Sequence, residues 1–202
     1  LLGWNPGNDE EIFTLDELKK IFTVERLNRS PAIFDIVKLT WMNGQYIRKL
    51  SDEEFAALAM PYIEKVLSRK VDVATLCKVL QLRIETLGDI PGQIDFLENV
   101  PEYANDLYIN KKMKTDVDIA KQTLAYALEA LEKTNEWTND NLFAVLKGAA
   151  EEKGIKNGQI MYPVRIALSG KETTPGGATE LAVILGKDES LKRLGNALKK
   201  LG

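Results

Sequence analysis

The chain has 202 residues, of which 45% are hydrophobic and 28% charged, and its formal net charge is −3. This composition predicts a globular protein with one large or two small cores, and it excludes a disordered chain. The sequence contains no histidine, which excludes every mechanism with a histidine base and most zinc sites. No apolar run approaches the roughly 20 residues of a membrane span, so we expect no membrane partner.

The ends of the chain and its cysteine content suggest where the protein works. The single cysteine, Cys77, cannot form a disulfide within the chain, which fits a reducing cytoplasm. No secretion signal is recognised, so we expect a cytoplasmic location. The sequence begins Leu-Leu-Gly-Trp without a methionine, as if cut from the end of a helix. We therefore expect a fragment of a longer protein.

Charge is spread unevenly along the chain. Residues 1–100 carry 12 lysines and arginines against 16 aspartates and glutamates, whereas residues 101–202 carry 15 against 14. This balance argues against a generally basic coat for nucleic acid. A structured RNA needs only a local basic surface, but charge alone favours an ordinary soluble protein.

The first half of the chain shows short helix signals. A capping box at residues 14–17 opens a helix to Phe22, and residues 30–31, Ser-Pro, break the chain. Asp35 can cap the next helix, which we expect to end at the Asn-Gly pair of residues 43–44.

The next helices are marked by caps and prolines. A second capping box, at residues 51–54, opens a helix to Met60, and Pro61 is expected to start a new segment. Asp72 opens a strong helix that the pattern extends to Leu87, and Gly88 closes it.

The second half of the chain is helical as well. Pro91 starts a helix to about Val100, and Pro101 is the best candidate for a domain boundary. A third capping box, at residues 115–118, opens the longest helix, which runs to Lys133. Further helices are expected over residues 138–154, 160–169, 178–186 and 189–201. No strand alternation is present, so the predicted class is all-α, with two bundles joined near residue 100.

Residues 159–177 gather groups that suit a polyanion or the edges of nucleobases. Arg165 and Lys171 supply cations, Thr173 and Thr174 supply hydroxyls, and a Gly-Gly pair leaves the backbone open to a partner. Arg165 lies off the apolar stripe of its helix, so we expect it at the surface. No nucleophile and base form a pair here, so we expect no catalytic residue.

Two other groups of cations have several interpretations. Arg83 projects within the apolar arc of the helix over residues 72–87, where an unpaired buried arginine would be costly. It either reaches the rim, pairs with a carboxylate, or awaits a polar ligand.

In the last helix, Lys192, Arg193, Lys199 and Lys200 are expected to form a solvated face, although they could also face phosphate.

Several blocks of sequence carry a family resemblance. Residues 34–48, FDIVKLTWMNGQYIR, closely resemble the stem-contact region of bacterial-type glutamyl-tRNA synthetases, a class I aminoacyl-tRNA synthetase family. The motifs at residues 83–87, 163–170 and 174–176 also appear in family order. The resemblance covers effectively the whole chain.

The resemblance implies an organisation and a reaction. The family's catalytic signatures are absent, so the chain resembles the C-terminal part of the enzyme. It would hold the end of the stem-contact domain (1–48) and two helical anticodon-binding subdomains (49–100 and 101–202) that form a cage. The parent would attach glutamate to tRNA with ATP. ATP and Mg would bind the absent catalytic domain, and no cofactor or metal is expected in this fragment.

The resemblance also implies roles for individual residues. Arg83 matches the arginine that inspects the third anticodon base, which separates glutamate from glutamine tRNAs. Arg165 and Thr174 match residues near the other two bases, and we expect both arginines to face one cavity. Further possible tRNA contacts are Trp41, Asn43, Tyr46, Arg48, Lys171 and Thr173. Gly177-Ala178 replaces bulkier family residues and leaves the shape of the loop open.

Partners follow from the same comparison. The expected partner is glutamate tRNA, with glutamine tRNA left open, and we expect neither DNA nor a membrane as a partner, and a monomeric parent. The alternative is a helical adaptor whose grooves bind a protein. The missing catalytic signatures fit both hypotheses, whereas the ordered motifs favour tRNA.

Overall fold

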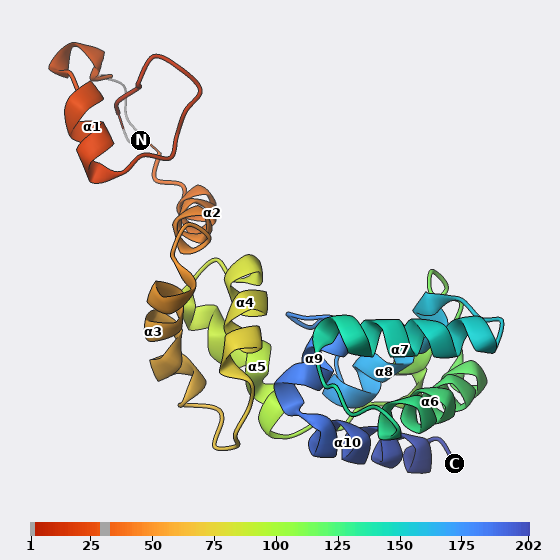
Figure 1. Ribbon diagram of the computed structural model, residues 1–202. Helices are drawn as coiled ribbons and strands as arrows, with labels where there is room; N and C mark the ends of the chain where they lie inside the picture. The colour runs from red at the N-terminus through yellow and green to blue at the C-terminus, as the bar shows by residue number, and fades with distance from the viewer. Residues whose placement is uncertain (1–2, 29–32) are drawn as a thin grey trace.

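The computed structural model describes residues 3–28 and 33–202, and these residues form ten α-helices, three 3-10 helices and no β-strand (Figure 1). The α-helices are α1 (Leu15–Ile21), α2 (Ile36–Ile47), α3 (Asp52–Ile63), α4 (Val73–Arg83), α5 (Ile90–Glu98), α6 (Val117–Glu132), α7 (Asn139–Glu152), α8 (Asn157–Ser169), α9 (Ala178–Leu185) and α10 (Lys187–Lys200). The predicted all-α class is confirmed. The predicted break at residues 30–31 lies outside the described residues.

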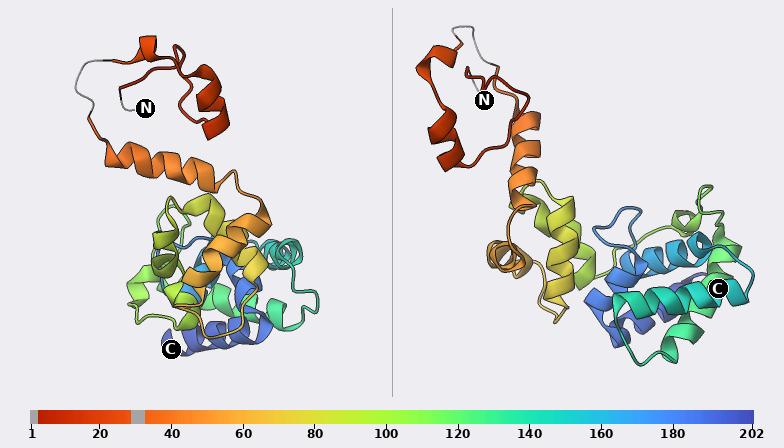
Figure 2. Two further views of the ribbon diagram at one scale, coloured as in Figure 1. Left: turned by 90° about the vertical axis from the view of Figure 1, so that its left-hand side faces the viewer. Right: turned by 45° about the horizontal axis from the view of Figure 1, so that its top comes forward.

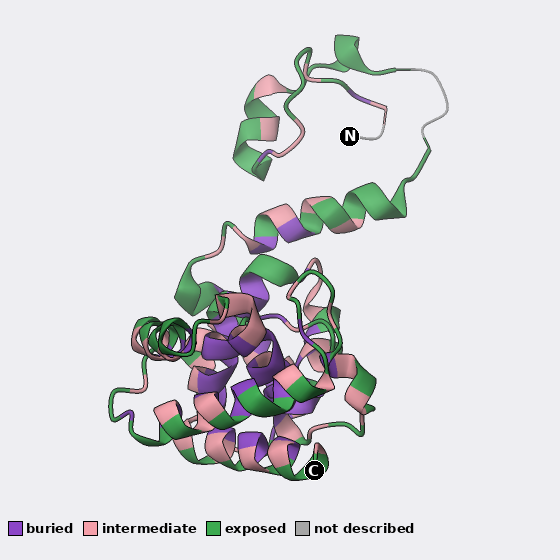
Figure 3. Ribbon diagram, turned by 90° about the vertical axis from the view of Figure 1, so that its right-hand side faces the viewer, coloured by how far each residue is buried: buried purple, intermediate pink, exposed green. Residues whose placement is uncertain are grey.

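The helices form two groups and an N-terminal extension. Helices α3 to α5 pack together, α6 to α10 pack together, and α2 leads away to the segment that contains α1 (Figures 1 and 2). Burial follows this division, because most buried residues lie in the two groups, while α1 and α2 are largely exposed (Figure 3). No helix of the described residues is long and apolar enough to cross a membrane.

One hydrophobic core extends through both groups of helices. It runs from Ile47 at the end of α2 to Ala197 in α10. Helix α4 contacts α9, and the backbone N–H of Asp72 donates to the carbonyl of Ile184 at 3.0 Å. The elements on either side of Pro101 therefore pack directly against each other, and the division into subdomains at residue 100 stays a prediction.

Local capping signals correctly placed several helix starts. The capping boxes at Thr14 and Ser51 are both present, with the hydroxyl of each accepting from the backbone N–H three residues on. Asp35 and Asp72 also cap their helices as predicted. The third box is wrong in detail, because Asp116 and not Thr115 caps α6.

Three predicted helix ends are wrong, and contacts with residues outside each prediction's local pattern explain them. Helix α2 continues through Gly44, whose missing side chain permits close approach, since a Cβ there would lie 3.3 Å from Glu85 Cα. Helix α3 continues through Pro61, because the buried side chains of Ala59 and Ile63 hold its last turns in the core.

Helix α4 ends at Arg83, one turn earlier than predicted. The carboxylate of Asp89 accepts hydrogen bonds from the backbone N–H groups of Glu85 at 3.2 Å and Thr86 at 2.8 Å. These bonds replace the helical partners that the two N–H groups would otherwise need. Arg83 therefore occupies the last helical position instead of a position in the helix interior.

Candidate nucleic-acid interface

Arg165 lies on α8 and is held by two neighbours. Its guanidinium sits over the ring of Tyr162, 5.3 Å from the centroid, and Nη1 donates to Thr174 Oγ1 at 3.2 Å. Thr174 Oγ1 in turn donates to the carbonyl of Gly176 at 2.7 Å. Ring and hydroxyl thus fix the planar cation in one orientation.

Arg165 is half-buried, and is therefore less exposed than predicted. Burial lowers the pKa of the Arg165 guanidinium, while Tyr162 and Glu172 act in the opposite direction. An arginine remains charged at neutral pH despite such a shift. A partly desolvated, pre-oriented guanidinium can stack on a base or donate to its acceptors without a large loss of side-chain entropy.

The start of the loop after α8 is tightly fixed. Gly170 ends the helix in the left-handed conformation, with φ 63°. A Cβ on this residue would lie 2.9 Å from both Tyr103 Cδ1 and Val100 Cγ1, so both backbone and packing require glycine. Ser169 Oγ donates to the carbonyl of Arg165 at 2.7 Å and accepts from the N–H of Lys171 at 3.1 Å.

The loop also docks on the first group of helices. Lys171 Nζ forms an ion pair with Asp95 and donates to the carbonyl of Gly92 at 3.3 Å, both on α5. Lys171, predicted as a tRNA contact, therefore has a protein partner. Thr173 is exposed.

Gly176 brings the loop against α4, toward which the loop projects (Figure 1). A Cβ on Gly176 would lie 3.4 Å from Val79 Cγ1, which is ordinary contact distance. Val79 and Arg83 are four residues apart on α4 and so share a helix face. The loop that holds Thr174 therefore lies one helical turn from Arg83.

Arg83 itself is exposed, and its side chain has no hydrogen-bond or ion-pair partner among residues 3–28 and 33–202. Of the three interpretations left open by the sequence, pairing with a carboxylate is therefore wrong, whereas an arginine that reaches the rim agrees with the exposure of Arg83. A cation at the last residue of a helix is favoured by the helix dipole. That Arg83 and Arg165 line one cavity stays a prediction.

Four of the other possible tRNA contacts predicted from the sequence lie on α2 and directly after it. Trp41 is exposed, whereas Asn43 Nδ2 donates to the carbonyl of Glu85 at 2.5 Å and Tyr46 Oη to that of Phe13 at 2.7 Å. Arg48, the C-cap of α2, has a buried Nη1 without a partner among the described residues. Asn43 thus ties α2 to the segment that follows Arg83.

One basic residue of the last helix was assigned wrongly from the sequence. Arg193 belongs to no solvated face, because only 4% of it is exposed. Ser190, Leu194 and Ala197 are the other buried residues of α10, and their spacing with Arg193 is that of one helix face. That spacing was the signal that could have identified a buried arginine.

The sequence matches the family model described as "Anticodon binding domain" over residues 54–198, which is most of the chain. The chain belongs to the anticodon-binding domain family. This match covers α4 to α9 completely, and it covers α3 and α10 except for the first residues of α3 and the last residues of α10. It therefore includes the helices that carry Arg83 and Arg165.

Curated relatives of this anticodon-binding chain are named glutamate–tRNA ligase. The protein from Clostridium kluyveri is 49% identical over 201 residues, which is 100% of this chain and 41% of the relative. A relative from Clostridium botulinum is 48% identical, with 100% and 42% covered. The chain thus spans about two fifths of the length of the curated relatives it matches.

Solved structures share the fold. A glutamate tRNA ligase from Elizabethkingia meningosepticum in complex with its amino acid superposes with a TM-score of 0.85 at 24% identity, over 100% of this chain and 40% of that one. Glutamate-tRNA synthetase from Elizabethkingia anophelis gives a TM-score of 0.77 at 26% identity, over 98% and 39%.

The described residues offer no metal centre. No group of three histidine, cysteine, aspartate or glutamate side chains among residues 3–28 and 33–202 could hold an ion. The buried thiol of Cys77 packs in the core, and burial raises its pKa. What the anticodon-binding chain presents instead is a set of arginine and hydroxyl donors on adjacent elements.

Proposed function

We propose that this chain is the anticodon-reading part of a glutamate–tRNA ligase. Arg83, Arg165 and Thr174 would contact the anticodon bases, with Arg83 inspecting the third base. The observation that carries the proposal is the contact of Gly176 with Val79, which joins the loop of Thr174 to the helix of Arg83. Cations on two helices can then act on neighbouring nucleotides.

The rest of the protein would perform the chemistry. The proposed parent reaction attaches glutamate to tRNA with ATP, and the residues for ATP and Mg²⁺ would belong to the part of the ligase outside this chain. We propose a cytoplasmic, monomeric parent whose partner is glutamate tRNA. Its discrimination against glutamine tRNA depends on Arg83 and on the shape of its neighbourhood.

The proposed discrimination has a simple physical origin. A donor that meets no acceptor in the complex has lost its hydrogen bond to water without gaining another. This loss costs about 1–3 kcal/mol of binding free energy for each group. A site built on guanidinium and hydroxyl donors therefore rejects a base whose acceptors lie elsewhere. Arg165 is already oriented by Tyr162 and Thr174, so it cannot adapt freely to a wrong base.

The test compares two RNAs that differ at one base. Binding of the 202-residue chain to glutamate tRNA, and to the same tRNA with the third anticodon base of glutamine tRNA, is measured by gel shift at several salt concentrations. We expect Arg83→Gln to reduce the ratio of the two affinities by about tenfold, since one donor group is at stake.

Lys78→Gln is the matched control, because it removes one exposed positive charge from the same helix. It should lower both affinities equally and weakly, with a smaller salt dependence. Equal losses for both RNAs with Arg83→Gln would reject the reading role of Arg83. No salt-sensitive binding of either RNA would refute tRNA recognition and favour the protein-binding adaptor.

A further inference from the structure

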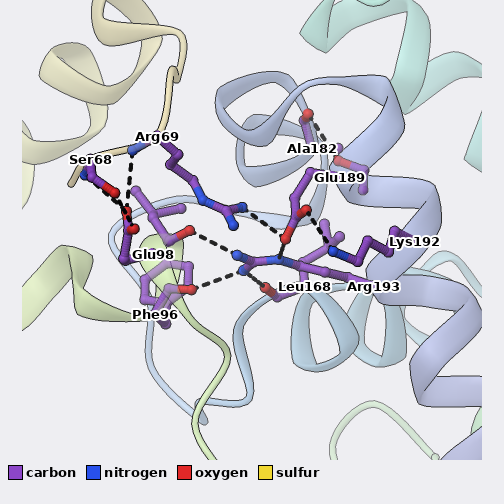
Figure 4. Close-up of polar contacts among 11 residues, drawn as sticks. Ser68, Arg69, Phe96, Glu98, Leu168, Ala182, Glu189, Lys192 and Arg193 are labelled. Atoms are coloured by element: carbon purple, nitrogen blue, oxygen red, sulfur yellow. Dashed lines mark hydrogen bonds and ion pairs between the residues drawn. The ribbon is translucent and has the colours of Figure 1, made fainter.

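Arg193 is a buried cation that joins three helices (Figure 4). From α10, its Nε donates to Glu189 Oε1 at 2.7 Å, and Nη1 donates to the carbonyls of Phe96 at 2.9 Å and Leu168 at 2.7 Å. Nη2 donates to the carbonyl of Leu97 at 2.8 Å. The guanidinium therefore uses the fork of donors that only arginine possesses.

The three carbonyls share a structural property. Phe96 and Leu97 lie in the last turn of α5, and Leu168 lies in the last turn of α8. Carbonyls in the last turn of a helix lack helical partners and carry the negative end of the helix dipole. Two helix ends, one from each group of helices, thus converge on one cation.

A second layer extends this contact to the segment between α3 and α4 (Figure 4). Glu189 Oε1 also pairs with Arg69 Nη1 at 2.8 Å. The carboxylate of Glu98 accepts from the backbone N–H groups of Ser68 at 3.0 Å and Arg69 at 3.3 Å. The segment that precedes α4 is therefore fixed to the end of α5 and to the first turn of α10.

The loop that holds Thr174 and helix α4, the two elements proposed to read the anticodon, both begin at this network. Leu168 lies one turn after Arg165 and directly before the turn at Gly170 that opens the loop of Thr174. On the other side, Arg69 precedes α4, which ends at Arg83. A shift of α5 against α8 would change the separation of the two arginines.

We propose that Arg193 is a positioning residue for anticodon discrimination. It fixes the placement of α8 relative to α5 and α4, and so the spacing of Arg165 and Arg83, without contacting the RNA. The inference rests on the proposed function. Buried ion pairs add little net stability because desolvation offsets their attraction, and the role we assign to this network is to fix one geometry.

The test uses two variants with the same loss of charge on the same helix. Arg193→Gln removes the buried fork, whereas Lys192→Gln alters a side chain that is 69% exposed and lies 3.8 Å from Glu189. Binding of the 202-residue chain to glutamate tRNA and to its third-base variant is measured, and helicity and thermal unfolding are recorded in parallel. If Arg193→Gln does not fold, the same measurements are made on Arg69→Gln, which lies at the partly exposed edge of the network.

We expect Arg193→Gln to reduce the affinity ratio of the two RNAs by about tenfold, the loss expected for Arg83→Gln, because a misplaced donor no longer meets its acceptor. Arg69→Gln should give a smaller loss in the same direction, and Lys192→Gln should leave the ratio unchanged. Arg193→Lys should restore only part of it, because an ammonium cannot serve both helix ends with a planar fork.

A combined variant separates positioning from mere stability. If Arg193 acts by placing Arg83, Arg193→Gln with Arg83→Gln should lose less discrimination than the sum of the single losses. An unchanged affinity ratio in folded Arg193→Gln, or in Arg69→Gln where Arg193→Gln does not fold, would overturn the inference and leave the proposed function intact. Failure of the unaltered chain to distinguish the RNAs would refute both.

Discussion

Replacing Gly170 by alanine should destabilise the protein through two separable effects. The residue has φ 63°, and a left-handed conformation costs a residue with a Cβ about 1–2 kcal/mol. The new methyl group would also lie 2.9 Å from Tyr103 Cδ1 and Val100 Cγ1 and 3.2 Å from Pro101 Cδ. Overpacking of this kind costs about 1–3 kcal/mol.

Gly154 supplies a matched control, because its φ is 66° but nothing lies within 4 Å of its ideal Cβ. Gly154→Ala should therefore lose about 1 kcal/mol from conformation alone. Gly170→Ala should lose about 3 kcal/mol in total, which lowers Tm by roughly 6–12 °C for a chain of this size.

Urea unfolding followed by circular dichroism measures both losses. The midpoints should move while the slopes stay equal, since neither change alters the surface exposed on unfolding. The difference between the two variants then isolates the packing contribution at the start of the loop. Equal losses in the two variants would refute the close packing of Gly170 against Tyr103 and Val100.

Three further outcomes are expected. Thr174→Val is a nearly isosteric change and should weaken tRNA binding about tenfold, because Arg165 loses its hydroxyl partner. The affinity is measured by gel shift, and an unchanged affinity would exclude Thr174 as an orienting group. Burial would raise the pKa of Glu189, but hydrogen bonds from Arg193 and Arg69 outweigh it and lower the pKa. Stability from Glu189 is thus present above its unfolded pKa of about 4.3 and lost as pH falls through the lower folded value, so Glu189→Gln should flatten acid unfolding curves in that range. Burial raises the pKa of Cys77. The stability contributed by the protonated thiol is therefore present below an unfolded pKa of about 8.5 and is lost as pH rises through the folded value. Thiol labelling at pH 8 should be slower for the folded than for the urea-unfolded chain, and equal rates would contradict the burial of Cys77.

Helix starts could be predicted because the bonds that make them are local. Thr14, Ser51 and Asp72 each accept from a backbone N–H three residues on, so residue type and spacing suffice. Helix ends were harder to predict, because local breakers compete with packing. Proline at 61 and glycine at 44 would end isolated helices, yet both lie inside helices whose last turn carries a buried isoleucine, Ile63 in α3 and Ile47 in α2.

The motifs of the candidate site were visible in the sequence, but their surroundings were not. Arg165 and Thr174 were correctly grouped, since they lie within ten residues of each other. Their direct hydrogen bond and the ring of Tyr162 beneath the guanidinium came only with the structure. The partial burial of Arg165 was not predicted, and the sequence left the exposure of Arg83 open, because each depends on where a helix ends or what packs against it.

The sequence by itself determined the all-α class, most helix starts and the family, because these depend on local patterns and ordered motifs. Only the tertiary structure decided which cations are buried and which elements meet. Arg193 contacts the carbonyl of Phe96, 97 residues away, and Gly176 meets Val79 across the predicted domain boundary. Such contacts join free helix ends and apolar faces that are far apart in the chain, and no local pattern encodes which of them meet.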